Sequence, residues 1–427
     1  MLGITLLVFL ILIVIGMPVA FVLGISGLTY ILISGQYSFL INIPQTLVGG
    51  INKFSLLAIP FYILVAELMN AGGVTKHIVN FFRKLIGHFV GGLSYVNIVV
   101  SAFLSSIVGS VNAVAAITST SIVPEMRKDG YENSKASALS AASAIMGPII
   151  PPSMVLIIFG VSANTSVGDL FIAGIIPGIM LAVAFFVIAY ISARKNLTLV
   201  KHPRPKLYDL SGSFIKVLPA LSIPMFILIG IIKGVFTPTE AGAVGCLIAL
   251  ILGVFVYKQL TWSTLLTVLF RTGTTTGSLL IIMSTASLFS WVLARERIPQ
   301  QIADILLSIS EEHWVILLLI NIFLLFVGLF LDAVTAIIIL VPVFLPVILE
   351  IGIDPIHFGI FMTLNLVIGL ITPPVGISLF IVSSITKVSV YKLSIAVLPY
   401  VIASIIVLLV IVYIPELSTW LPSLLRD

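Results

Sequence analysis

The sequence predicts an all-α, polytopic membrane protein built from two inverted repeats. Its composition excludes a soluble protein, because 60% of the 427 residues are hydrophobic, only 9% are charged, and the mean hydropathy is +1.27. Soluble domains contain roughly 45–50% apolar and about 25% charged residues. Disorder is excluded too, since apolar residues dominate nearly every window. The spacing of the apolar segments and an internal repeat support the same fold class.

The apolar segments have the lengths of membrane-spanning helices. One span needs about 20 apolar residues, so the chain has room for roughly ten spans. Segments 91–123 and 313–349 are too long for one span and are predicted to be two crossings or re-entrant hairpins. Segments 39–51 and 261–269 are too short to span and are predicted to lie in the membrane interface. All spanning candidates fall near residues 2–34, 54–72, 91–123, 138–160, 170–193, 217–236, 239–257, 273–294, 313–349, 357–382 and 393–414.

Several kinds of site lack support in the sequence. One cysteine, Cys246, excludes a disulfide framework and a cysteine-based metal cluster. Neither GxxxxGK[ST] nor GxGxxG after a strand occurs, so no nucleotide is predicted. The net charge of +5 is explained by Lys and Arg on the cytoplasmic side of a membrane protein. We therefore expect no nucleic acid partner.

An internal repeat relates the two halves of the chain. Residues 124–177 align without a gap to residues 346–399, so that Pro124 pairs with Pro346 at an offset of 222 residues. The same offset relates 17–34 to 239–256, which predicts a break of the first segment near Gly16, Met17 and Pro18. Most identical pairs are Gly or Pro, the residues that fix backbone breaks. These pairs are Pro124/Pro346, Gly130/Gly352, Gly147/Gly369, Ile149/Ile371, Pro151/Pro373, Pro152/Pro374, Ser162/Ser384 and Pro177/Pro399.

Charge shows that the repeats are inverted. The loop after Pro124 contains Arg127, Lys128 and Lys135, whereas residues 347–357 contain two acids and neither Lys nor Arg. Cytoplasmic loops are rich in Lys and Arg. Alternate assignment along the chain puts 16 of the 21 Lys and Arg in the cytoplasm and both termini outside. Equivalent loops on opposite sides are the mark of many secondary transporters. The five basic residues left outside are Lys53, Lys233, Arg295, Arg297 and Arg426.

Two proline pairs predict broken helices at symmetric positions. They lie in the motifs MGPIIPPS, residues 146–153, and IGLITPPVG, residues 368–376. Adjacent prolines remove backbone donors and free the carbonyl groups of the preceding turn. In a membrane such groups must line a cavity or bind a ligand. Freed carbonyls with side-chain oxygens suit a sodium ion, which prefers oxygen ligands.

Each break is preceded by a candidate hairpin with a small or polar tip, at residues 105–113 and 328–335. Helix ends at a tip attract ions, and a tip that meets a broken helix would create a cation site near the midplane. Among the acids only Glu67 and Asp332 lie deep in predicted spans, and an intramembrane carboxylate marks an ion or substrate path. Asp332 is the candidate ion ligand, with a structural hydrogen bond to a neighbouring helix as its alternative. Glu67 lies nearer a span end and is interpreted as structural.

The basic pair Arg295 and Arg297 ends a predicted span on the outer side. A guanidinium can hold a carboxylate substrate through two hydrogen bonds. Snorkelling to the interface and pairing with Glu296 are the alternatives.

The motifs GPIIPPS, GLFLDAVTA followed by LVPVFLP, and GLITPPVGISLF resemble those of the large membrane subunit of TRAP (tripartite ATP-independent periplasmic) transporters, in its unfused form. The resemblance extends over the whole chain. It implies an elevator transporter with two re-entrant hairpins and two broken helices, located in the bacterial inner membrane. It also implies sodium-coupled uptake of a small organic acid anion, of the sialic acid or C4-dicarboxylate class, and no enzymatic activity. The implied partners are a small four-helix membrane subunit and a periplasmic substrate-binding protein.

The resemblance also implies two sodium sites and a substrate site. Sodium site one is assigned to Gly109, Ser110, Gly147, Ile150 and Pro151. Sodium site two is assigned to Asp332, Thr335, Gly369 and Thr372. The residues assigned to substrate binding are Ser106, Asn112, Ser153, Arg295, Arg297 and Gly376.

The predicted organisation has five parts. Residues 1–90 form the first scaffold helices and interfacial arm, 91–177 the first transport unit, 178–312 the linker with the second scaffold and arm helices, 313–399 the second transport unit, and 400–427 a terminal helix and tail. Two alternatives stay open. One is a stand-alone sodium- or proton-coupled anion or dicarboxylate permease that needs no binding protein. The other is an intramembrane enzyme that uses Asp332 and Glu67 as paired carboxylates.

Overall fold

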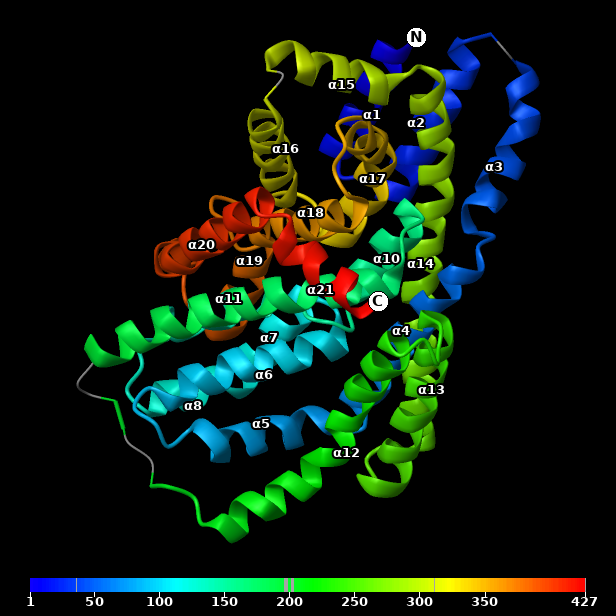
Figure 1. Ribbon diagram of the computed structural model, residues 1–427. Coiled ribbons are helices and arrows are strands. Elements are labelled where there is room, and N and C mark those ends of the chain that lie inside the picture. Colours follow the sequence, from blue (N-terminus) through cyan, green and yellow to red (C-terminus); the bar gives the residue numbers. More distant parts are fainter. Residues whose placement is uncertain (36, 196–198, 201–202, 311, 427) are drawn as a thin grey trace.

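The computed structural model describes residues 1–35, 37–195, 199–200, 203–310 and 312–426, without the side chains of Ser106, Ile107, Lys195, Leu207 and Arg426. The regular secondary structure of these residues is helical (Figure 1). Seven of the helices are long and apolar enough to cross a membrane, which agrees with the predicted polytopic fold. They are Phe54–Ala71, Val167–Arg194, Tyr208–Ile232, Pro238–Val256, Trp262–Arg295, Ala333–Glu350 and Val390–Tyr413.

The first apolar segment is divided where its glycine and proline predict. Gly16 adopts a left-handed φ of 81°, and Pro18 precedes the second helix, so one continuous helix cannot form. The helices up to residue 86 are α1 (Leu2–Val14), α2 (Val19–Ile33), η1 (Tyr37–Ile41), α3 (Asn42–Ile51), η2 (Phe54–Leu57), α4 (Ala58–Ala71) and α5 (Val74–Ile86).

The next segment forms the first hairpin and the first broken helix. The hairpin turns at Gly109 and Ser110, and the helix break spans residues 145–153. The helices are α6 (Gly92–Val108), α7 (Val111–Ser121), α8 (Val123–Lys128), α9 (Asn133–Ala144), α10 (Met154–Ala163) and α11 (Val167–Lys195).

The second half repeats this order. Helices α17 and α18 begin 222 residues after α7 and α9, at the pairs Val111/Ala333 and Asn133/Pro355. The predicted hairpins and broken helices are therefore confirmed in both repeats. The helices are α12 (Leu207–Ile232), α13 (Pro238–Ile251), the π-helical η3 (Leu252–Val256), α14 (Trp262–Arg295), α15 (Ile298–Ile309), α16 (His313–Gly328), α17 (Ala333–Glu350), α18 (Pro355–Gly369), α19 (Ile377–Thr386), α20 (Val390–Tyr413) and α21 (Glu416–Arg426).

One expected element is wrong. Residues 261–269 are not a separate interfacial helix but the first turns of the 34-residue helix α14. In the first repeat the equivalent chain is interrupted between α3 and α4, where Pro60 lies in the first turn of α4. Proline has no amide hydrogen and clashes with the preceding turn, so it prevents a continuous helix. The position equivalent to Pro60 is Ile282, which allows α14 to continue.

Helix α14 organises one side of the molecule. Figure 1 shows it running the length of one edge, with α2 and α3 beside one half and α4 near the other, and these three helices pack against it. In the broken helices, α9 packs against α6, α7 and α20, and every residue of α18 from His357 to Gly369 is buried. The second half of the first broken helix, α10, packs against α17 and also against α4.

Candidate functional site

A cavity of about 560 Å³ lies between the two hairpin tips. The first tip contributes Gly109 and Ser110, and the second contributes Asp332 and Thr335. Pro148 and Leu370 bring the two helix breaks to the same cavity. The cavity therefore collects residues that are more than 200 positions apart in the sequence.

The first tip is built by a glycine and a capping serine. Gly109 has a left-handed φ of 64° and ends α6, a conformation that strains other residues. Ser110 begins α7 as its N-cap, and its hydroxyl accepts a hydrogen bond from the amide of Ala113 at 3.4 Å. Ser110 is exposed within the cavity. The Ser110 hydroxyl thus lies at the N-terminal end of α7, beside the backbone amides of its first turn.

Asp332 occupies the equivalent position of the second tip. It is the N-cap of α17, and one carboxylate oxygen accepts a hydrogen bond from the amide of Val334 at 3.2 Å. This hydrogen bond caps α17 itself and does not reach a neighbouring helix, and the residue is exposed to the cavity. A helix N-terminus stabilises a negative charge. The amides at the start of α17 thus favour a carboxylate at this tip, where Asp332 lines the cavity.

Each tip is pressed against a helix break through a glycine. A Cβ atom added at Gly147 would lie 2.6 Å from the Cβ of Ser105, and one added at Gly109 would lie 3.0 Å from the Cβ of Met154. In the second repeat, a Cβ at Gly369 would lie 2.6 Å from the Cα of Gly328. Such distances are shorter than normal carbon contacts of about 3.5–4.0 Å. Only glycine lets the predicted parts of each sodium site approach this closely.

In the first break some backbone carbonyl oxygens are free of hydrogen bonds and others accept them. Among the described residues, no hydrogen bond reaches the carbonyl oxygens of Gly147 and Ile150. By contrast, the hydroxyl of Ser153 donates to the carbonyl oxygen of Pro148 at 2.6 Å and accepts from the amide of Leu156 at 3.2 Å. Ser153 is fully buried, so here its hydroxyl holds the break and caps α10. Pro151 is buried beside it. In the second break, the hydroxyl of Thr372 donates to the carbonyl oxygen of Ile368 at 2.7 Å.

Asn112 connects the two repeats. Its side-chain oxygen accepts a hydrogen bond from the hydroxyl of Ser378, at 2.7 Å. Ser378 belongs to α19, whose N-cap is Gly376 with a φ of 51°. The first hairpin is thereby fixed to the second broken helix. Of the predicted substrate residues, Asn112 makes this connection and Gly376 lies two residues before its partner Ser378. The side chain of Ser106 lies outside the described residues.

The cavity has a further wall that the sequence did not predict. Glu67 and Asn70 on α4 line it, and so does Thr275 on α14. Glu67 therefore faces the same cavity as Asp332 instead of a purely structural position. The sequence carries a signal for this wall, because Ile63, Glu67 and Asn70 follow the spacing of one helix face and all three line the cavity.

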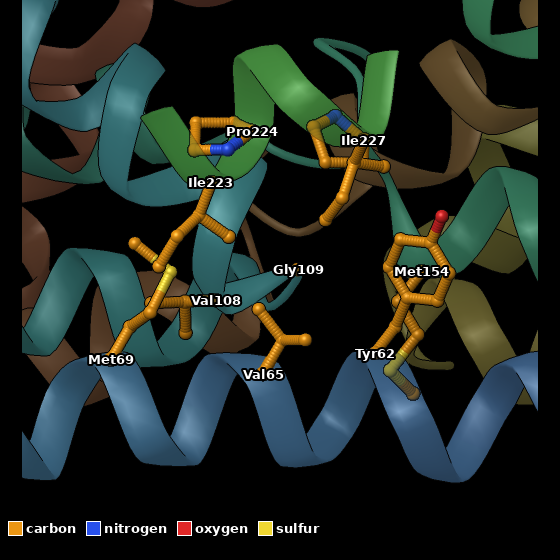
Figure 2. Close-up of a pocket in the computed structure, with 10 residues that line it drawn as sticks. Tyr62, Val65, Met69, Val108, Gly109, Met154, Ile223, Pro224 and Ile227 are labelled. Atoms are coloured by element: carbon orange, nitrogen blue, oxygen red, sulfur yellow. The ribbon is translucent and has the colours of Figure 1, made fainter. Parts of the chain in front are cut away.

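An apolar contact adjoins this wall beside the first tip. Figure 2 shows Tyr62 and Met69 on one face of α4, opposite Ile223 and Ile227 of α12, with Gly109 of the tip between them. The space enclosed is only about 20 Å³. The tip thus faces α4 and α12 across a narrow, apolar space.

Arg295 and Arg297 are not among the residues that line the cavity. The guanidinium of Arg295 lies 4.2 Å from the ring centroid of Phe39 and 5.9 Å from that of Trp291. Glu296 accepts a hydrogen bond from the hydroxyl of Tyr30. Arg297 is exposed and precedes α15. The structure does not bring these arginines to the two tips, and their binding of substrate stays a prediction.

Comparison with known proteins identifies the family of this arrangement. Residues 6–417 match the family model of the DctM component of the tripartite ATP-independent periplasmic transporter. The chain belongs to this family. As a TRAP large permease it is a transporter subunit and not an enzyme, so the intramembrane enzyme is excluded.

Two relatives cover almost the whole TRAP permease. The sialic acid TRAP transporter large permease protein SiaM of Vibrio cholerae is 40% identical over 413 residues, which are 96% of this chain and 95% of that protein. The C4-dicarboxylate TRAP transporter large permease protein DctM of Pseudomonas aeruginosa is 37% identical over 401 residues, 94% and 93% of the two chains. The expected family membership is therefore confirmed over nearly the full length.

A solved structure shares the fold of the TRAP permease. The YdaH transporter of Alcanivorax borkumensis superposes with a TM-score of 0.64 over 89% of this chain and 88% of that chain. The two sequences are 15% identical. The comparison therefore supports the architecture alone.

Proposed function

We propose that this TRAP permease imports a small organic acid anion, of the sialic acid or C4-dicarboxylate class, by sodium-coupled elevator movement in the bacterial inner membrane. The observation that carries the proposal is the cavity in which both hairpin tips, with Ser110 and Asp332 at helix N-termini, face each other. The names of the relatives support the substrate class, since SiaM is named for sialic acid and DctM for C4-dicarboxylates.

The proposed sodium sites are the two contacts between a tip and a break. Site one consists of Gly109, Ser110, Gly147, Ile150 and Pro151. Site two consists of Asp332, Thr335, Gly369 and Thr372. Hydroxyl, carboxylate and backbone carbonyl oxygens suit a hard cation. Because each site needs two segments of chain, sodium binding would stabilise the tip against its break.

The substrate would then bind between the tips. Its negative charge is favoured by the N-terminal ends of α7 and α17 and by the sodium ions. The surface that α4 and α12 present to the first tip is apolar, so few hydrogen bonds would have to break when the tip moves past it. In this proposal residues 91–177 and 313–399 move together as the transport domain, and the remaining helices form the scaffold. A small membrane subunit extends the scaffold, and a periplasmic binding protein delivers the substrate.

Uptake into proteoliposomes tests the proposal. The permease is reconstituted with its small subunit, and the binding protein is added outside with acids selected by their thermal shift of that binding protein. We expect sodium-dependent uptake that Asp332→Asn reduces strongly. The matched control Asp304→Asn changes an exposed acid on α15 that does not line the cavity. Unchanged sodium dependence in Asp332→Asn contradicts site two, and equal uptake without the binding protein favours the stand-alone permease.

A further inference from the structure

A second cavity, of about 580 Å³, lies on the side that the charge pattern assigns to the cytoplasm. It is enclosed by the first turns of α5, the end of α7, α8 and α12. Asn70, at the end of α4, lines both this cavity and the cavity between the tips. Helix α7 also runs from one to the other, with Val111 in the first cavity and Ser121 in the second. The two cavities therefore share Asn70 as a wall residue.

The second cavity is basic. Its charged lining consists of Lys76, Arg83, Lys216 and Glu125, together with His77. Arg83 and Glu125 form an ion pair at 2.6 Å, which leaves two positive charges uncompensated. Among the described residues neither Lys76 nor Lys216 forms a salt bridge, and both are exposed to the cavity.

An aromatic contact lies beside the backbone of both lysines. His77 stacks on Tyr257 with ring centroids 4.7 Å apart, and the hydroxyl of Tyr257 donates to the carbonyl oxygen of Lys216 at 2.9 Å. The positive charges also affect His77. Burial, followed by the charges of Lys216 and Lys76, lowers the pKa of this histidine.

We propose that this second cavity is a release site that binds the carboxylate of the transported anion between Lys76 and Lys216 on its way from the hairpin tips to the cytoplasm. The inference rests on the proposed function. Two ammonium groups can pair with one or two carboxylates, and pairs in an exposed setting are weak. Weak binding suits an exit site, because the anion must leave again.

Inhibition of uptake by internal substrate tests the release site. Binding protein added outside drives only permeases whose outer side faces it, so the luminal solution contacts the second cavity of each active molecule. In Lys76→Gln/Lys216→Gln we expect half-inhibition at about fivefold higher internal substrate, the change expected for the loss of two exposed ion pairs. The external concentration for half-maximal uptake and the sodium dependence should not change. Wild-type inhibition in the double variant overturns the proposal.

A matched variant controls for the loss of charge alone. Lys128→Gln/Lys206→Gln removes two exposed lysines from the same side without touching the cavity. We expect this variant to show the internal inhibition of the wild type. A fivefold shift in the control as well would overturn the release site, because general surface charge would then explain the effect.

Chemical labelling tests the site without transport. Purified permease with its small subunit, in neutral detergent, is treated with an amine-reactive reagent in succinate, in N-acetylneuraminate or in chloride of equal ionic strength. We expect at least one carboxylate to protect Lys76 and Lys216, but not Lys128, from modification. Protection without any uptake of organic acids would overturn the proposed function but retain the carboxylate site. Uptake without protection by either carboxylate would overturn the site itself.

Discussion

The contact between Gly369 and Gly328 gives the sharpest test of the proposed second sodium site. A Cβ atom at residue 369 would lie 2.6 Å from the Cα and from the carbonyl oxygen of Gly328. Carbon atoms pack at about 3.5–4.0 Å, so in Gly369→Ala the tip and the break must separate by about 1 Å. The neighbouring atoms are backbone atoms, which cannot move aside by changing a rotamer.

We expect Gly369→Ala to destabilise the protein and to weaken sodium binding together. Overpacking of this kind costs about 1–3 kcal/mol. The measurements are the thermal unfolding of the purified permease with its small subunit and the sodium dependence of uptake in proteoliposomes. Because Asp332 and Thr335 follow the displaced segment, half-maximal uptake should need more sodium, and sodium should stabilise the variant less than the wild type.

The matched control is Gly273→Ala in α14, where an added Cβ meets no atom within 4 Å. Alanine is favoured over glycine inside a helix by about 0.5–1 kcal/mol, so this variant should be as stable as the wild type or slightly more stable. Wild-type sodium dependence in Gly369→Ala, with the expected loss of stability, would show that the contact is structural only. Wild-type stability as well would refute the packing argument.

Three further predictions follow from the same structure. Gly147→Ala should impair the first site, and Ser105→Gly should restore it, because the neighbour there is a side chain whose Cβ lies 2.6 Å away; sodium-dependent uptake of the single and double variants checks this. Asn112→Ala and Ser378→Ala should each lower thermal stability by about 1 kcal/mol, and a double-mutant cycle should show that their effects are not additive, since they share one 2.7 Å hydrogen bond. The pKa of His77 is lower in the folded protein than its ordinary value of about 6.5. The stability that neutral His77 supports is therefore present above that pH and is lost as the pH falls below it. Between about pH 7.5 and 5.5, the unfolding temperature of the wild type should thus drop more than that of His77→Asn.

The positions of glycine and proline made the elements of this fold readable. Gly16 with Pro18 and the two proline pairs at 151–152 and 373–374 are local conditions on the backbone, and each divides a helix where the sequence predicts. The same residues defined the repeat at an offset of 222 residues, and charge in the loops gave its inverted sense. The prediction for residues 261–269 was wrong because a short amphipathic segment is not distinguishable, by composition, from the first turns of a long helix.

The sequence alone determined that the protein lies in a membrane. It also determined the repeat, the hairpins, the helix breaks and the family, because hydropathy, Gly and Pro act locally along the chain. Only the tertiary structure decided what faces the cavity. Glu67 and Thr275 line it because α4 and α14 pack beside the tips, and Arg295 lies apart because it contacts the ring of Phe39. These placements depend on contacts between distant segments. The few charges in the loops therefore predict the sides of the membrane, while packing decided which carboxylates share one cavity.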